Sequence, residues 1–173
     1  TIQIHNKTIR LEQSYIINSL MEEAIASSIL EGAATTHRVA KEMLRKGREP
    51  RNRSEQMVIN NYRAMRYIGE QKDVPLTPDF ITDIHRTVTE QTLEEAAVGR
   101  FRENDDIVVA DPVTGVVHHT PPEHTRIREM IEELCRFANA DDDDAGTFIH
   151  PIIKGIILHF LIGYIHPFED GNG

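Results

Sequence analysis

The sequence predicts a mainly α-helical fold with a single β-hairpin, and three observations support this. Apolar side chains recur at helical spacing through most of the 173 residues. Helix-capping residues precede these stretches, and several end at glycine. Two short runs of β-branched residues flank a turn sequence in the middle of the chain. We therefore expect a bundle of helices that carries one hairpin.

Four helices are expected before the hairpin, each with a start or stop signal. They cover about residues 14–32, the stretch from a Thr36 cap to Gly47, a stretch that begins at a Ser54 cap, and one that opens at Thr77-Pro78. In the first of them the apolar residues fall at i, i+3, i+4, i+7 and i+8, which is the pattern of one buried face. These helices should bury one side each.

The hairpin is expected where Ile107-Val108-Val109 and Val116-Val117 flank the turn sequence Asp111-Pro-Val-Thr-Gly115. A fifth helix should follow Pro121-Pro122. The sixth begins at Pro151, and apolar residues cover nearly all its faces, which predicts a helix buried at the centre of the bundle.

Composition excludes several functional classes. The 19 basic and 28 acidic residues give a formal charge of −9, which argues against a nucleic-acid partner. Cys135 is the only cysteine, so a disulfide framework and a zinc site with several thiolates are both excluded. The longest apolar stretch, Ile152 to Ile165, is too short to span a bilayer. We therefore expect a cytoplasmic protein without a membrane partner.

The last eight residues, His166-Pro-Phe-Glu-Asp-Gly-Asn-Gly173, carry the groups that suggest chemistry. A histidine titrates near neutrality and can act as a base. The Asp170 carboxylate could hold Mg²⁺ together with phosphate oxygens. The Gly-Asn-Gly sequence can turn successive N–H groups toward an anion. Each feature is common alone, but the ordered string indicates phosphoryl or nucleotidyl transfer.

This string resembles the signature of the Fic (filamentation induced by cAMP) family, His-Pro-Phe-x-Asp/Glu-Gly-Asn-Gly-Arg-x-x-Arg, in its first eight positions. Upstream, Gly99-Arg-Phe-Arg102, the hairpin and His150-Pro151 follow the order of a Fic core. The resemblance implies a Fic core over residues 54–173, preceded by N-terminal helices over residues 1–53.

The resemblance implies a protein adenylyltransferase, an enzyme that moves AMP from ATP to a Ser, Thr or Tyr hydroxyl of a target protein. His166 would be the base that takes the proton of that hydroxyl. Asp170 would hold Mg²⁺ against the phosphates, and Gly171, Asn172 and Gly173 would bind phosphate oxygens. Because family members often associate, a homodimer is a further expectation.

Two more segments receive roles from the resemblance. Ile107, Val108, Val109 and Ala110 would form a flap that docks an extended target segment by strand addition. The sequence Ser27-Ser-Ile-Leu-Glu31-Gly resembles the inhibitory motif Ser/Thr-x-x-x-Glu-Gly/Asn of self-restrained Fic proteins. Glu31 would be the inhibitory residue, and Ser27 would steady it.

The signature's two arginines would stand at positions 174 and 177, so we expect this chain to be a fragment that lacks the C-terminal part of the fold. Two other enzymatic activities keep the same fold: transfer from another nucleotide or a phosphocholine-type donor, and removal of AMP. A third interpretation, from another class, is a non-catalytic interaction module.

Overall fold

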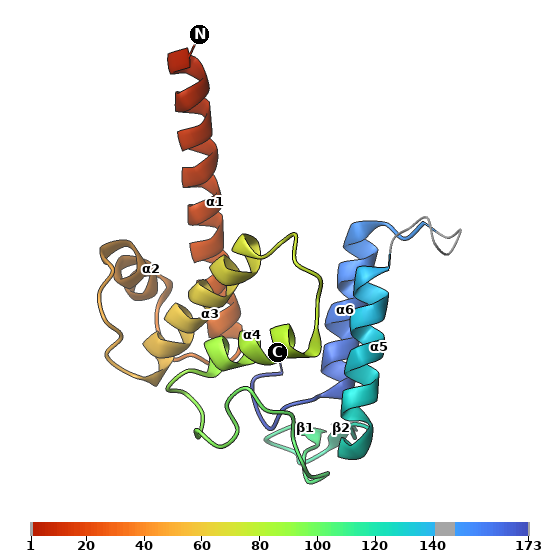
Figure 1. Ribbon diagram of the computed structural model, residues 1–173. Coiled ribbons are helices and arrows are strands. Elements are labelled where there is room, and N and C mark those ends of the chain that lie inside the picture. Colours follow the sequence, from red (N-terminus) through yellow and green to blue (C-terminus); the bar gives the residue numbers. More distant parts are fainter. Residues whose placement is uncertain (1, 141–147, 173) are drawn as a thin grey trace. The chain divides into compact units, whose positions relative to one another are not determined.

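The computed structural model describes residues 2–140 and 148–172, with side chains from Ser14 onward within those ranges. It is mainly helical with one two-stranded sheet, as predicted (Figure 1). The chain divides into two compact units. One contains residues 1–72 and 87–92, and the other contains residues 73–86 and 93–173.

Three helices build the first unit: α1 (Ile2–Leu30), α2 (His37–Lys46) and α3 (Arg53–Glu70). Helix α1 packs against both α2 and α3, and the core consists of fully buried residues, namely Ile25, Ala40, Met43 and Val58. Helix α1 starts well before the predicted residue 14. Helix α3, which we assigned to the Fic core, lies in this first unit.

The ends of these helices confirm one predicted cap and correct another. Thr36 accepts a hydrogen bond from the Val39 N–H at 3.3 Å, as a predicted N-cap should. Helix α3 is capped by Asn52, whose side-chain oxygen accepts from the Glu55 N–H at 2.9 Å. The predicted cap, Ser54, lies inside the helix, and its hydroxyl instead accepts from the Ala34 N–H at 2.9 Å.

The second unit contains most of α4 (Pro78–Thr89), then α5 (Ile127–Asn139) and α6 (Pro151–Ile165). A short 3₁₀ turn, η1 (His124–Arg126), leads into α5. Helices α5 and α6 lie side by side (Figure 1). The core of the unit is formed by buried apolar residues, namely Ile81, Ile127, Ile131, Leu134, Cys135, Ile165 and Phe168.

The hairpin pairs β1 (Val109–Ala110) with β2 (Val117–His119) in antiparallel fashion. Its five-residue turn is the predicted one, and the Asp111 carboxylate accepts from the N–H groups of Val113 and Thr114 at 2.9 and 2.6 Å. Strand β1 is shorter than expected, because Ile107 and Val108 precede it, whereas β2 begins one residue later than expected and extends to His119.

Helix α6 is not buried on all sides, so this part of the fold prediction was wrong for the chain described. Ile152 and Phe160 are 67% and 65% exposed, and only Ile165 is fully buried. An apolar helix is buried only where another element covers it. Among the described residues α5 is the helix that packs against α6, and the core reaches it at one face through Leu158, Leu161 and Ile162.

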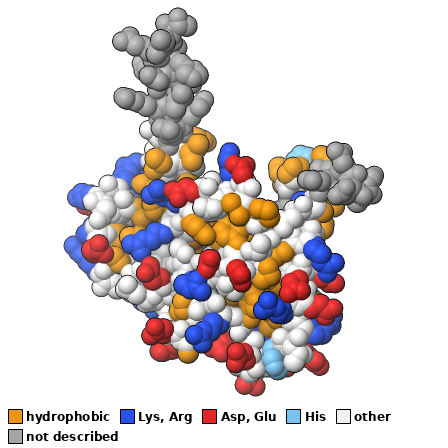
Figure 2. Space-filling view, viewed as in Figure 1, with side chains coloured by type: hydrophobic (Ala, Val, Ile, Leu, Met, Phe, Trp, Pro, Cys, Tyr) orange, Lys and Arg blue, Asp and Glu red, His pale blue; other side chains and the backbone are white. Residues whose placement is uncertain are grey.

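The surface carries charges of both signs. Figure 2 shows acidic and basic side chains interspersed over the face in view. Within residues 2–140 and 148–172, no helix combines the length and the apolar character that crossing a membrane requires.

Candidate active site

The predicted base, His166, occupies the C-cap of α6. Its backbone is left-handed (φ 48°, ψ 60°), and its N–H donates to the Ile162 carbonyl at 2.9 Å. The following Pro167 cannot continue a helix and is fully buried, so the chain turns here. Burial lowers the pKa of the half-buried His166 side chain, against a smaller opposing effect of the Gly163 carbonyl. The neutral imidazole, the form that a base needs, is therefore favoured at pH 7.

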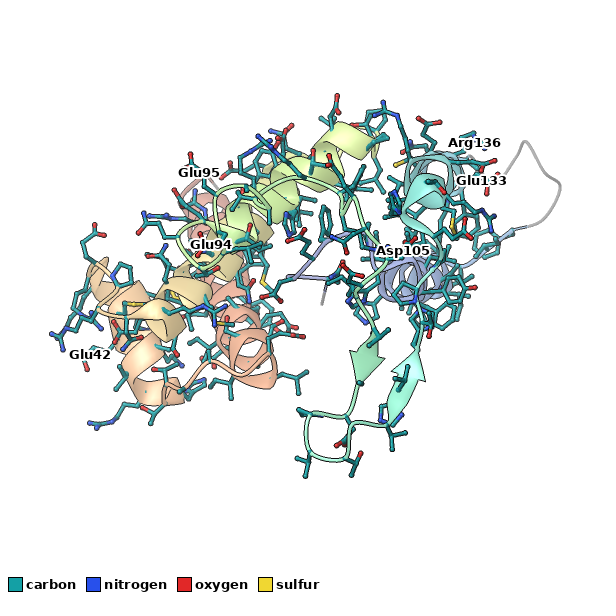
Figure 3. All side chains as sticks on the ribbon, turned by 90° about the horizontal axis from the view of Figure 1, so that it is seen from below. Glu42, Glu94, Glu95, Asp105, Glu133 and Arg136 are labelled. Atoms are coloured by element: carbon teal, nitrogen blue, oxygen red, sulfur yellow. The ribbon has the colours of Figure 1, made fainter. Side chains whose placement is uncertain are left out.

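The buried side chain of Arg102 holds the backbone on both sides of this turn. Its Nε donates to the His166 carbonyl at 2.9 Å, and its Nη2 donates to the Pro122 carbonyl. Its Nη1 donates to the Asn104 carbonyl at 2.7 Å and to the carboxylate of Asp105, labelled in Figure 3, at 2.9 Å. Buried guanidinium groups are stable only when their donors are paired, and here they are. Arg102 thereby fixes the end of α6.

The loop after Pro167 is anchored by a stack of two rings. Phe168 is buried, and its ring lies parallel to that of His85 from α4, with centroids 3.7 Å apart and 7° between the planes. The His85 Nδ1 accepts from the Gly99 N–H at 2.9 Å, and its Nε2 lies 2.9 Å from the Asp170 carbonyl oxygen. The loop is thus attached to α4 by packing and by polar contact.

The loop also closes upon itself. The Asn172 side-chain oxygen accepts from the Phe168 N–H, and its amide nitrogen donates to the Phe168 carbonyl, both at 2.8 Å. The Gly171 N–H donates to the Asp170 Oδ1 at 2.7 Å, and Gly171 has φ 72°, a conformation that favours glycine. Since the Asn172 amide is engaged in the loop, any phosphate contact of Asn172 would use its backbone N–H. Gly173 lies outside the described residues.

Asp170 is the residue of this loop that the Fic resemblance assigns to metal binding. Its carboxylate is exposed, and one oxygen accepts from a backbone N–H. Within the described residues, no group of three or more His, Cys, Asp or Glu side chains could hold a metal ion by itself. One exposed carboxylate fits Mg²⁺, which takes most of its ligands from water and substrate phosphates. It does not fit zinc, which needs three or four protein ligands.

The comparisons with known proteins agree with this geometry. Residues 75–173 match the model of the Fic/DOC family. The chain belongs to the Fic/DOC family. Among curated relatives, protein adenylyltransferase Fic of Nematostella vectensis is 29% identical over 113 residues, which is 64% of this chain and 24% of that protein. The protein of the same name from Drosophila melanogaster is 27% identical over 112 residues, 64% of this chain and 20% of the relative.

Solved structures give the same Fic assignment. A Fic domain-containing signaling protein from Bacteroides thetaiotaomicron superposes with a TM-score of 0.77 at 25% identity, over 93% of this chain and 61% of that one. Fic-1 from C. elegans shares the fold, with a TM-score of 0.64 at 18% identity over 99% of this chain and 56% of that one. The chain spans between a fifth and a quarter of the length of the curated Fic relatives it matches.

The flap predicted from the Fic resemblance, residues 107–110, begins two residues before β1 and ends at the last residue of β1. Val108 is 45% exposed, and Ile107 and Val109 are half-buried. The end of the hairpin opposite the turn contacts α6. The His119 Nε2 lies 2.7 Å from the Tyr164 carbonyl oxygen, and the ring centroids of His119 and Tyr164 lie 5.1 Å apart. The hairpin is thus attached two residues before His166.

The segment that resembles the Fic inhibitory motif, residues 27–32, lies at the end of α1. The Ala33 N–H donates to the Ser28 carbonyl at 2.8 Å, and the Gly32 N–H donates to the Ile29 carbonyl at 3.1 Å, which together form a Schellman cap. Glu31 is the residue just past the helix, and its side chain is exposed. Ser27 contributes a backbone contact, its carbonyl accepting from the Glu31 N–H at 2.9 Å.

Sequence reasoning missed two residues that hold the end of α6 and the loop after Pro167 in place. Arg102 was noted only as part of a motif, and nothing in the sequence revealed which carbonyls it binds. His85 was overlooked, although it stands four residues after Ile81 on the apolar face of α4. A histidine at a core-facing position is the signal that could have drawn attention to it.

Proposed function

We propose that this protein is a Fic-type protein adenylyltransferase that transfers AMP from ATP to a hydroxyl side chain of a target protein. The observation that carries the proposal is a half-buried histidine, favoured in its neutral form, fixed at the end of α6. It stands four residues before a carboxylate, in a loop whose backbone is held by Arg102, His85 and Asn172. The names of the curated relatives support the same reaction.

In the proposed reaction His166 takes the proton from the target hydroxyl. The hydroxyl oxygen then bonds to the α-phosphorus of ATP, the bond from that phosphorus to the bridging oxygen breaks, and pyrophosphate leaves. The proton remains on the imidazole until solvent takes it. A neutral imidazole is required at the start, and the lowered pKa of His166 supplies it.

Phosphate binding is assigned to the loop that follows. Asp170 would hold Mg²⁺, which when bound neutralises charge on the α- and β-phosphates. Backbone N–H groups of Asn172 and Gly173 would donate to phosphate oxygens, and the Gly171 N–H would join them once ATP draws it from the Asp170 Oδ1. Most of the acceleration would come from groups already fixed in place, and the hydrogen bonds around Phe168 supply that rigidity.

Target docking is assigned to the flap, residues 107–110. An extended segment of the target could pair with this strand, with Val108 exposed to meet it. The hairpin contacts α6 at Tyr164, two residues before His166. A target segment docked on the hairpin would therefore lie on an element that is attached next to the proposed base.

Inhibition is assigned to Glu31, with Ser27 as its support. The exposed carboxylate stands at a helix end where the macrodipole disfavours an anion, so stability does not explain its presence. A carboxylate available to a cation outside its own helix is what an inhibitory role requires.

The test is the fate of labelled ATP with the complete protein and a mixture of candidate target proteins. Label at the α-phosphate should enter protein, whereas label at the γ-phosphate should not. Parallel reactions with other nucleotides and with a phosphocholine-type donor would detect a different donor. Entry of γ-label, or no entry of any label, would contradict adenylyl transfer.

A further inference from the structure

We propose that His85 is a positioning residue of the active site, which orients Asp170 by donating a hydrogen bond to its backbone carbonyl. The inference rests on the proposed function, because it assigns His85 to the residue expected to hold Mg²⁺. His85 itself touches no substrate in this arrangement. It acts through Asp170.

The polar contacts of His85 define its tautomer. A backbone N–H can only donate, so the Nδ1 that receives the Gly99 N–H at 2.9 Å carries no proton. The proton of the neutral ring is then on Nε2, which lies 2.9 Å from the Asp170 carbonyl oxygen. Both ring nitrogens are satisfied in one orientation, and the residue is only 2% exposed.

Packing alone does not explain a histidine at this position. A phenyl ring could stack on Phe168 equally well, since the two rings lie 3.7 Å apart and almost parallel. It would leave the Gly99 N–H and the Asp170 carbonyl without the bonds they make to imidazole, at a cost typical of unsatisfied buried groups. The choice of imidazole therefore points to the two polar contacts.

The hydrogen bond from His85 to the Asp170 carbonyl also restrains the Asp170 carboxylate. His85 holds the carbonyl of Asp170, and the same residue's Oδ1 accepts from the next N–H, that of Gly171, at 2.7 Å. Backbone and carboxylate of Asp170 are thus fixed at two points. Removal of the first point should let the peptide rotate and should move the carboxylate away from the metal.

Three variants separate the two contacts. In His85→Gln the side-chain amide can still reach the Asp170 carbonyl, whereas in His85→Asn the shorter amide can accept only from Gly99. His85→Phe keeps the stack and loses both contacts. We expect His85→Asn and His85→Phe to weaken Mg²⁺-dependent nucleotide binding and kcat by about 10- to 100-fold, as changes to outer-shell partners do. His85→Gln should stay within about 3-fold of wild type, and the KM for the target protein should not change in any variant.

The measurement is calorimetry of Mg²⁺ with a non-cleavable ATP analogue bound to the complete protein, followed by AMP transfer. Melting curves establish that each variant is folded at the assay temperature. Rescue by Gln but not by Asn supports the proposal. Equal losses in Gln and Asn, or wild-type binding in Phe, would overturn it.

A spectroscopic signature keeps this proposal distinguishable from the proposed function. In ¹⁵N-labelled protein, the His85 ring should appear as the Nε2–H tautomer without any ligand. If wild type transfers no AMP while that tautomer is present, the proposed function fails and the assignment of the contacts stands. If the Nδ1–H tautomer is found, the His85 inference fails whatever the activity.

Discussion

The Arg102 guanidinium is buried, and its hydrogen bonds explain at the scale of single residues why the end of α6 keeps its shape. It donates to the carbonyls of His166, Asn104 and Pro122 and to the Asp105 carboxylate. A planar fork of five donors can reach four acceptors, and an ammonium cannot. The shape of the Arg102 guanidinium therefore matters as much as its charge.

Arg102→Lys should thus destabilise the protein although it keeps the charge. We expect a loss of about 3 kcal/mol, because a buried charge would lose most of its partners. Chemical denaturation followed by circular dichroism would measure it. Arg100→Lys, at an exposed neighbouring position, is the matched control and should change stability by less than about 0.5 kcal/mol. Equal effects of the two changes would contradict the role of Arg102.

The pKa of His166 makes a prediction about pH. Burial lowers it from the ordinary value of 6.5, so the neutral base persists to lower pH than for a free histidine. As pH falls through the lowered pKa the base becomes protonated, and kcat/KM for AMP transfer should fall with a midpoint below 6.5. A pH–rate profile measured well below saturation tests this. A midpoint above the ordinary value would show that His166 is not the buried base.

At this scale, the sequence alone could identify only those site residues that lie close together in the chain. His166, Asp170 and Gly171 stand within a few residues of one another, so their chemistry could be inferred from the string alone. His85 and Arg102 act on the same loop from 85 and 64 residues away in sequence. Contacts of that kind depend on tertiary packing, which a single sequence does not reveal.

At the scale of elements, local signals predicted the helices better than their burial. Caps at Thr36 and Thr77 were correct because they depend on neighbours three residues away. Helix α6 was predicted to be buried all round, yet several of its apolar side chains are exposed. The pattern of apolar residues shows which faces of a helix could be buried. Whether they are buried depends on the elements that cover the helix.

Two glycines at or near helix ends should respond to alanine in opposite ways. Gly32 closes the α1 cap with φ 92°, a left-handed conformation that costs a side chain about 1 kcal/mol, so Gly32→Ala should be destabilising. Gly69 lies inside α3 with ordinary backbone geometry and open space where an alanine methyl group would stand, so Gly69→Ala should stabilise by about 0.5 kcal/mol or more. Thermal unfolding of both variants is the measurement. The same sign in both would refute the assigned helix ends.

At the scale of the whole molecule, the two units divide the proposed functions between them. The residues proposed for chemistry, His166 and Asp170, lie in the second unit, and the family match at residues 75–173 falls largely within it. Glu31, the proposed inhibitor, lies in the first. Catalysis and restraint would then be properties of separately packed parts of one chain.

Glu31→Gly in the complete protein should therefore raise AMP transfer without altering the base. We expect an increase of about 5-fold or more, the lower range of typical coupling between sites. The assay is incorporation of label from ATP into target protein, with Glu49→Gly as the control at another exposed glutamate of the first unit. Unchanged or lower transfer in Glu31→Gly would remove the inhibitory assignment while leaving adenylyl transfer intact.

The measurement that tests the central claim most directly compares two histidines of the same helical segment. His166→Ala removes the proposed base, and His159→Ala removes an exposed imidazole of α6. With ATP labelled at the α-phosphate, His166→Ala should lower AMP transfer by at least about 100-fold, the lower range for loss of a general base, while His159→Ala should retain it. Transfer by folded His166→Ala at the wild-type rate would contradict the account.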